Sequence, residues 1–243
     1  RAVAFGDDIS YQVTEVLAAN DGALCSKGDV VVIAVALAES VISAIGASET
    51  KVRAHVMGHE MAGSIAAHPM AGHGYDFDVP LLAGSHVTTE QGTGFVHIAP
   101  GHGVEDYELA HLKHGIAVPD TVGEDGVILP HLPVFGGMHV LRDNAKIAEI
   151  MAEHKGVIGI GKLVHSYPHS WRSKAPLIYR NTAQWFVSME THGLRDIALG
   201  ELAKTKFYPA AGQKRLTSMI AQRPDWCLSR QRAWGVPLTI FAH

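Results

Sequence analysis

One short stretch of the chain, residues 92–110 (GTGFVHIAPGHGVEDYELA), most constrains what the chain can fold into. Residues 95–99 alternate as the residues of a β-strand do, and residues 100–103 break that strand. From Val104 the spacing of apolar residues suits a helix, which Gly115 would end. The stretch therefore predicts a strand, a tight turn and a helix in immediate succession.

This arrangement makes His97 and Asp106 candidate functional residues, because a tight turn could bring both side chains over one pocket. Each also has an ordinary structural explanation. A strand histidine is commonly a packing or surface residue, and the helix dipole alone favours Glu105 and Asp106 in a first turn. However, Gly101 and Gly103 would let the backbone approach a ligand, and the helix start offers free N–H groups. The convergence of polar groups predicts a binding site.

The composition is typical of a globular protein. The chain has 243 residues, of which 47% are hydrophobic and 18% are charged. No apolar run approaches the length of a membrane span, so no membrane segment is expected. The sequence begins at Arg1 rather than methionine, which suggests a piece of something longer. Cys25 and Cys227 form no CxxC pair, which favours a reducing, cytoplasmic setting.

The charge is unevenly distributed. Residues 1–165 hold 9 Lys and Arg against 20 Asp and Glu, a net charge of −11, whereas residues 166–243 hold 11 against 4, a net charge of +7. We therefore expect a domain boundary near residue 165. The later part interleaves Arg and Trp (RPDWCLSRQRAWG), as a surface near nucleic acid does, but a solvated helical region explains the charges equally well.

The remaining pattern predicts an α+β domain built around a mostly β core. Strands are expected over residues 11–18, 29–34, 51–63 and 79–88. Helices are expected over residues 36–46, 143–156, 193–205 and 213–222.

The sixteen histidines raise the possibility of a metal site, but their spacing does not support one. His55 and His59 stand in the order HxxxHE rather than the HExxH of zinc proteases, and they fall in a predicted strand. The glycine-rich HPMAGHG lacks a carboxylate at ligand spacing. GxSxG, GxGxxG and phosphate-loop motifs are absent as well. We expect no metal.

Three long blocks together resemble consecutive segments of bacterial isoleucyl-tRNA synthetases: GTGFVHIAPGHGVEDY, SYPHSWRSKAPLIYRNTAQWFVSM and RPDWCLSRQRAWGVPL. The resemblance covers nearly the whole chain. It implies a β-barrel-like editing domain (the insertion called CP1) over residues 1–165. A smaller, basic helical connecting segment, residues 166–243, would return toward the catalytic domain.

The resemblance also implies a chemistry. Isoleucine and valine differ by one methylene, and this family is the standard example of the problem, with about 150-fold discrimination in the first pocket. A second site hydrolyses valyl-adenylate or valyl-tRNA(Ile) with water, without a metal or a covalent intermediate. By resemblance, Asp106 binds the α-ammonium of the substrate, and His97 lines the side-chain pocket and excludes isoleucine. The turn Gly101, His102 and Gly103, together with Gly94, would contribute to substrate binding.

Several departures from the family pattern limit this reading. The threonine-rich editing strand and the PAN motif of the family should precede Arg1. Ser170 and Ser173 stand where some relatives carry a CxxC zinc half-site. The signatures HIGH and KMSKS are absent, so ATP and Mg²⁺ belong to the synthetic site of the parent enzyme, and no cofactor is expected here.

The expected partners are the acceptor end of tRNA(Ile) and the rest of the synthetase chain, with the protein a monomer. Two alternatives remain open. One is a tRNA-positioning module without hydrolysis of its own, and the more distant one is a metal-dependent hydrolase that uses the histidines.

Overall fold

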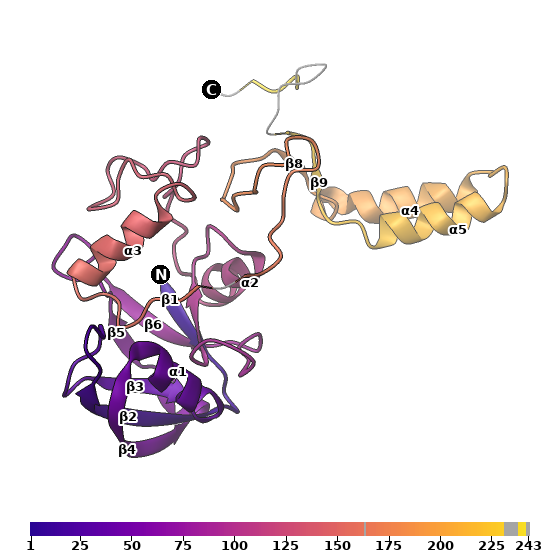
Figure 1. The fold of residues 1–243 in the computed structure, drawn as a ribbon. Coiled ribbons are helices and arrows are strands. Elements are labelled where there is room, and N and C mark those ends of the chain that lie inside the picture. Colours follow the sequence, from indigo (N-terminus) through magenta and orange to yellow (C-terminus); the bar gives the residue numbers. More distant parts are fainter. Residues whose placement is uncertain (163, 231–237, 242–243) are drawn as a thin grey trace. The chain divides into compact units, whose positions relative to one another are not determined.

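The computed structural model of the chain describes residues 1–162, 164–230 and 238–241. It divides into two compact units, Arg1–Asn181 and Thr182–His243, which are described separately below (Figure 1). Residues just before the division still pack on the first unit, since Arg180 Nε donates a hydrogen bond to the carbonyl of Val122 at 3.2 Å. The two compact units thus meet after Asn181, later than the change in charge near residue 165. The boundary of an editing domain at residue 165 stays a prediction.

A four-stranded sheet in the first unit carries the predicted turn. Its order is β5 (Ile65–Ala67), β6 (Asp78–Ala83), β1 (Ala2–Phe5) and β7 (Phe95–Ile98). Strand β1 is central, and it runs parallel to β6 and antiparallel to β7. Three of the four residues of β1 are buried. β1 therefore lies inside the sheet and pairs directly with β7, the strand that leads into the turn.

A second sheet of the first unit is antiparallel throughout, in the order β3 (Val30–Ala34), β2 (Ser10–Ala19) and β4 (Ala47–Met57). A short 3₁₀ turn, η1 (Val35–Leu37), leads from β3 into helix α1 (Ala38–Ile45). Gly46 ends this helix with a φ of 76°, a left-handed conformation that glycine adopts without steric cost. The predicted strand–helix–strand order is confirmed here.

Tyr11 joins the two sheets. Its side chain is fully buried, and its ring lies 4.7 Å from the ring of Phe95 on β7. The Tyr11 hydroxyl accepts a hydrogen bond from the Gly6 N–H at 3.0 Å and donates one to the carbonyl of Gly94 at 2.7 Å. Because a buried hydroxyl is costly unless it is paired, these bonds fix the start of β7 against β2.

The predicted strand–turn–helix over residues 92–110 is present in the structure. Strand β7 ends at Ile98, helix α2 (Val104–Tyr107) follows the turn, and a π-helical segment, η3 (Glu108–Lys113), continues it. Leu109 and Ala110 are buried, and they pack with Ile98 and with Ala2 and Ala4 of β1 in one core cluster. Burial of these side chains holds the helix over the end of the strand.

The rest of the first unit is mainly loop, with helix α3 (Asn144–Glu153) as predicted. Strand β4 is shorter than expected: it ends at Met57, and a 3₁₀ turn, η2 (Gly58–Met61), replaces the predicted strand end. The cause lies in Gly58, whose N–H donates a hydrogen bond to the carbonyl of Ile9 at 2.9 Å. The backbone of Gly6 lies so close to Gly58 that a side chain would not fit there. Likewise, β6 ends at Ala83 rather than continuing to residue 88.

The second unit contains a helical hairpin of α4 (Leu194–Lys204) and α5 (Ala211–Ala221), both predicted from the sequence. Strand β8 (Phe186–Val187) and the 3₁₀ turn η4 (Thr191–Gly193) precede α4, and strand β9 (Trp226–Cys227), which follows α5, pairs with β8 in a two-stranded ribbon.

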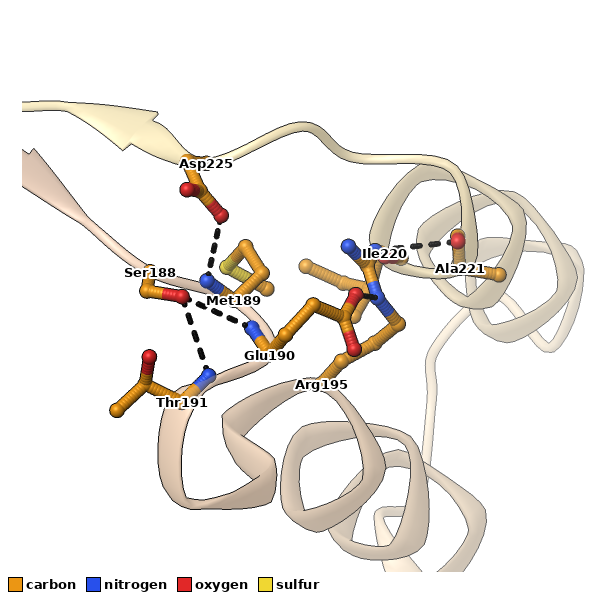
Figure 2. A network of polar contacts seen from close by, with 8 residues as sticks. All are labelled: Ser188, Met189, Glu190, Thr191, Arg195, Ile220, Ala221 and Asp225. Carbon is orange, nitrogen blue, oxygen red and sulfur yellow. Dashed lines mark hydrogen bonds and ion pairs between the residues drawn. The ribbon is translucent and has the colours of Figure 1, made fainter. Parts of the chain in front are cut away.

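Polar contacts tie the ribbon to the hairpin (Figure 2). The carboxylate of Asp225 accepts a hydrogen bond from the N–H of Met189 at 2.8 Å. The guanidinium of Arg195 donates to Glu190 at 2.7 Å and to the carbonyls of Ile220 and Ala221, at the end of α5.

The predicted α+β class is confirmed. Over the described residues, the two larger sheets stay open and separate rather than closing into a barrel. None of the helices in the described ranges is long and apolar enough to cross a membrane.

Candidate functional site

The carboxylate of Asp106 lies inside the turn between β7 and α2. Its Oδ2 accepts a hydrogen bond from the backbone N–H of Ala99 at 2.9 Å. The turn is closed by two backbone bonds, from His102 N to the carbonyl of Ala99 at 2.8 Å and from Tyr107 N to the carbonyl of Gly103 at 3.0 Å. Asp106 is half-buried, so the turn presents a fixed carboxylate that is partly shielded from water.

Gly103 leaves the space that this carboxylate occupies. The backbone of Gly103 is extended, with φ −153°, so its torsion angles would suit any residue. A Cβ placed there would, however, lie 3.2 Å from both Cγ and Oδ2 of Asp106. The absence of a side chain at Gly103 therefore leaves room for the side chain of Asp106. At Gly101, by contrast, a Cβ would meet its neighbours only at ordinary contact distance, 3.5 Å or more.

His97 lies on β7, opposite Val3 of β1. The residue keeps solvent-exposed surface, yet neighbouring atoms displace enough water from the ring to lower its pKa below the ordinary value of 6.5. The positive N-terminus and His102 lower this pKa further, whereas the negative charge of Asp106 raises it. His97 and Asp106 thus share one electrostatic environment, and the fold favours the neutral imidazole.

His68 is a neighbour of His97 that the sequence did not single out for this site. Its pKa is lowered, first by burial and then by the N-terminus, His97 and Arg1. Its ring stacks on Tyr75 with centroids 4.9 Å apart, and it lies 5.1 Å from the ring of Phe77. The spacing within HPMAGHG bears only on metal binding. The approach of His68 to His97 depends on folding and has no signal in the local spacing.

Both ring nitrogens of His102 are engaged. Nδ1 lies 2.7 Å from the carbonyl oxygen of Tyr179, and Nε2 lies 2.8 Å from the hydroxyl of Thr121. Because a carbonyl only accepts, Nδ1 carries the proton, and in the neutral ring Nε2 accepts from the threonine. These contacts hold the turn against two distant loops of the first unit.

A cavity of about 280 Å³ borders the turn. Gly101, His102 and Gly103 contribute to its wall together with Tyr107, Tyr179 and Asn181. The cavity is therefore made by the predicted turn and by the segment before residue 182. His97 and Asp106 are not among its lining residues.

Gly94 immediately precedes β7, at the opposite end of the strand from the turn. It is buried, with a φ of 83°, and a Cβ there would lie 2.4 Å from the Cβ of Ala34 and 3.2 Å from the ring of Tyr11. Close packing between the two sheets therefore explains why this position is a glycine. Its expected contact with substrate stays a prediction.

A larger cavity, of about 620 Å³, lies along the same helical segment. Glu105 and Glu108 line it from α2 and η3, and Asp7 and Asp8 line it from the loop after β1. This acidic cavity was not predicted, because Asp7 and Asp8 are about a hundred positions away from the glutamates in sequence.

Within the described ranges, no group of three or more His, Cys, Asp or Glu side chains is placed to hold a metal ion. At the half-site position, Ser170 and Ser173 make turn contacts: the hydroxyl of Ser170 accepts from the N–H of Ser173 at 3.3 Å. Whether the protein needs a metal or cofactor stays at the level of prediction. Part of the Arg- and Trp-rich block, residues 231–237, lies outside the described residues.

Comparison with known proteins identifies the class. The family model for class I tRNA synthetases (I, L, M and V) matches residues 7–243, so the chain belongs to this family.

Its curated relatives are isoleucine–tRNA ligases, as the resemblance predicted. The chain is 47% identical over 243 residues to the one from Pelagibacter ubique (strain HTCC1062), a match covering 100% of this chain and 26% of the relative. It is 42% identical to the one from Gluconobacter oxydans (strain 621H), covering 99% and 26%. It is also 42% identical to the one from Shewanella pealeana (strain ATCC 700345 / ANG-SQ1), covering 100% and 25%. The chain thus spans about a quarter of the length of these relatives.

Among solved structures, the crystal structure of GlLeuRS-CP1 is similar at a TM-score of 0.48 and 12% identity. The match covers 69% of this chain and 78% of that one.

Proposed function

We propose that the chain is the editing region of an isoleucyl-tRNA synthetase and that it hydrolyses misactivated or mischarged valine. The substrates are valyl-adenylate and valyl-tRNA(Ile), and the products of the latter are valine and free tRNA. The observation that carries the proposal is the half-buried carboxylate of Asp106, held inside the turn by the N–H of Ala99, in a chain whose relatives are isoleucine–tRNA ligases.

Asp106 is assigned to the α-ammonium of the substrate amino acid. Its Oδ2 is engaged by Ala99, but its negative charge still acts on its surroundings: burial lowers the pKa of His97, and the charge of Asp106 opposes that lowering. A carboxylate that stabilises nearby cations suits a cationic amino group, and such a contact is charge-assisted.

His97 is assigned to the fit of the side chain rather than to proton transfer. Its pKa is lowered, chiefly by desolvation, so the ring is neutral at neutral pH. A neutral ring avoids repelling the substrate ammonium beside Asp106 and can pack against an aliphatic side chain. One methylene is worth about 1–3 kcal/mol in such a pocket, so a single wall residue can separate valine from isoleucine.

Hydrolysis in this site proceeds by attack of water on the ester or mixed anhydride. The chain contributes position and oriented hydrogen bonds, which are strong sources of catalysis when the reacting groups are held in place. No metal takes part, and ATP and Mg²⁺ act in the synthetic site of the full-length enzyme. The site receives the acceptor end of tRNA(Ile), and we place the protein in the cytoplasm as a monomer.

The direct test is deacylation of valyl-tRNA(Ile) by the purified chain, compared with isoleucyl-tRNA(Ile), in buffer containing EDTA. The proposal expects weak release of valine, still less release of isoleucine, and no effect of EDTA. Equal hydrolysis of both substrates would contradict the proposal.

A second candidate function is a tRNA-positioning module without hydrolysis. The net charge of +7 in residues 166–243 favours it, because tRNA is a polyanion. Binding of tRNA(Ile) without any valine release would support this candidate. Zinc in elemental analysis, together with loss of hydrolysis in EDTA, would support a metal-dependent hydrolase.

A further inference from the structure

The end of the helical hairpin in the second unit carries a concentration of positive charge. We define the hairpin tip as residues 201–215, the end of α4, the connecting loop and the start of α5. Four cations lie within this span, against the single carboxylate of Glu201. They are Lys204, Lys206, Lys214 and Arg215, and all four are exposed.

The one acidic residue does little to neutralise this patch. Lys204 lies 2.8 Å from Glu201, but the side chains of both are about 70% exposed, at 72% and 66%. Exposed pairs of this kind contribute little free energy, so a polyanion can compete for Lys204. The first turn of α5 has no acidic residue, so the positive end of its helix dipole adds to the same potential.

The tip is held in shape from both ends of the hairpin. At the tip, the side-chain amide of Gln213 donates to the carbonyl of Leu202 at 2.9 Å, which joins α5 to α4. At the other end, Arg195 on α4 donates to the carbonyls of Ile220 and Ala221 on α5 at 2.7 and 3.1 Å (Figure 2). These hydrogen bonds hold the backbone of the hairpin in place. The four cations therefore sit on a preformed surface, and binding carries no cost for ordering that backbone.

An exposed aromatic ring accompanies the charges. Tyr208 is 80% exposed, and Nζ of Lys206 lies 5.3 Å from the centroid of its ring. A tyrosine so exposed makes no contribution to a core. Cations beside an accessible aromatic face are the combination that binds RNA, in which phosphates meet the cations and an unpaired base stacks on the ring.

We propose that the hairpin tip is an RNA-binding surface, with the phosphate backbone on its four cations and an unpaired base on Tyr208. The identity of the RNA as tRNA(Ile) rests on the proposed function. The binding itself does not, because it requires no editing chemistry.

The test measures fluorescence anisotropy of labelled, uncharged tRNA(Ile) with the full 243-residue chain, over a series of salt concentrations. The variant replaces Lys204, Lys206, Lys214 and Arg215 with Gln. The matched control replaces four exposed lysines of the first unit with Gln, namely Lys27, Lys51, Lys146 and Lys162. Both variants lose four positive charges, so a general effect of net charge is the same in each.

We expect the tip variant to bind at least about tenfold more weakly near 0.1 M salt. We also expect the slope of log affinity against log salt to fall by roughly three to four, since each of the four phosphate contacts contributes about 0.7–0.9. The control should stay within about twofold of the unmodified chain. A variant with Arg in place of the three lysines should bind normally, which excludes loss of folding as the cause. Equal losses in the tip variant and the control, or no binding by the unmodified chain, would overturn the proposal.

Two further measurements separate RNA from other polyanions and assign the ring. Tyr208→Ala should weaken binding about fivefold or more, since stacking of one base contributes about 1–3 kcal/mol, whereas Tyr208→Phe should not. Equal weakening by both substitutions would contradict the stacking role. Vesicles of phosphatidylserine serve as the comparison: if the chain binds them as tightly as tRNA, and the tip variant loses both, the surface is not specific for RNA and the proposal fails.

Discussion

The carboxylate of Asp106 accepts a hydrogen bond from the backbone N–H of Ala99 at 2.9 Å, across the turn that joins β7 to α2. One residue therefore ties the strand to the helix and also supplies the negative charge that we assign to substrate binding. The two roles can be separated, because asparagine has an oxygen that can accept the same hydrogen bond but carries no charge.

The structural role predicts different stabilities for two variants. Asp106→Ala leaves the Ala99 N–H without its partner, and we expect it to lower the free energy of unfolding by about 1–2 kcal/mol. Asp106→Asn keeps the bond and should lower it by less than about 0.5 kcal/mol. Urea denaturation followed by circular dichroism measures both. Equal losses in the two variants would mean that the charge, rather than the hydrogen bond, holds the turn.

Gly103 should be intolerant of even one added methyl group. In Gly103→Ala, the new Cβ would press on the Asp106 carboxylate from 3.2 Å, so we expect a loss of about 1 kcal/mol in the free energy of unfolding. Gly101→Ala is the matched control in the same turn, because its Cβ meets neighbours at 3.5 Å or more, and it should change stability by less than about 0.5 kcal/mol. A loss as large in the control would show that the turn as a whole, rather than the room for Asp106, requires glycine.

The parts of this site that could be predicted depend on local signals. Residues 100–103 break a strand through proline and glycine, and Gly115, with a φ of 67°, ends the following helical segment. Gly46 ends α1 in the same way. Such signals act within a few residues, so the pattern of neighbouring side chains is enough to predict them.

The parts that could not be predicted depend on contacts between distant residues. His102 is fixed by Thr121 and Tyr179, which lie 19 and 77 positions away, and no spacing in the sequence indicates either partner. The central strand β1 is only four residues long, and it is identified by its pairing with β6 and β7 rather than by its own pattern. Pairing of this kind is decided by the whole sheet, which is why β1 was missed.

Stability should depend on pH through His68 and His97. Folding lowers the pKa of each, chiefly by desolvation, so between the folded and unfolded pKa values the unfolded chain binds more protons. Their contribution to the free energy of unfolding is therefore complete above the unfolded-state pKa near 6.5. It is lost as the pH falls through the pKa values of the folded state. We expect the free energy of unfolding to be lower at pH 5 than at pH 7.5. The double variant His68→Gln, His97→Gln should reduce this difference, and an unchanged difference would refute the assignment.

Removing the imidazole of His97 should loosen the size filter. In His97→Ala, the pocket gains room for one more methylene, and hydrolysis of isoleucyl-tRNA(Ile) should rise about tenfold, at the lower end of what one methylene is worth. His59→Ala, an exposed histidine on η2, serves as the control and should leave isoleucyl-tRNA(Ile) intact. If His97→Ala also leaves it intact, His97 does not form the wall that excludes isoleucine.

The most direct test of the editing assignment is single-turnover hydrolysis of valyl-tRNA(Ile) by the unmodified chain and by Asp106→Asn, at equal folded concentrations. The substitution keeps the turn but removes the charge opposite the substrate ammonium. A hydrogen bond to a charged group contributes about 1.5–3 kcal/mol, so the account predicts a rate about 10- to 100-fold lower in the variant. A variant that hydrolyses valyl-tRNA(Ile) within about twofold of the unmodified chain would contradict the account, since the charge of Asp106 would then play no part in editing.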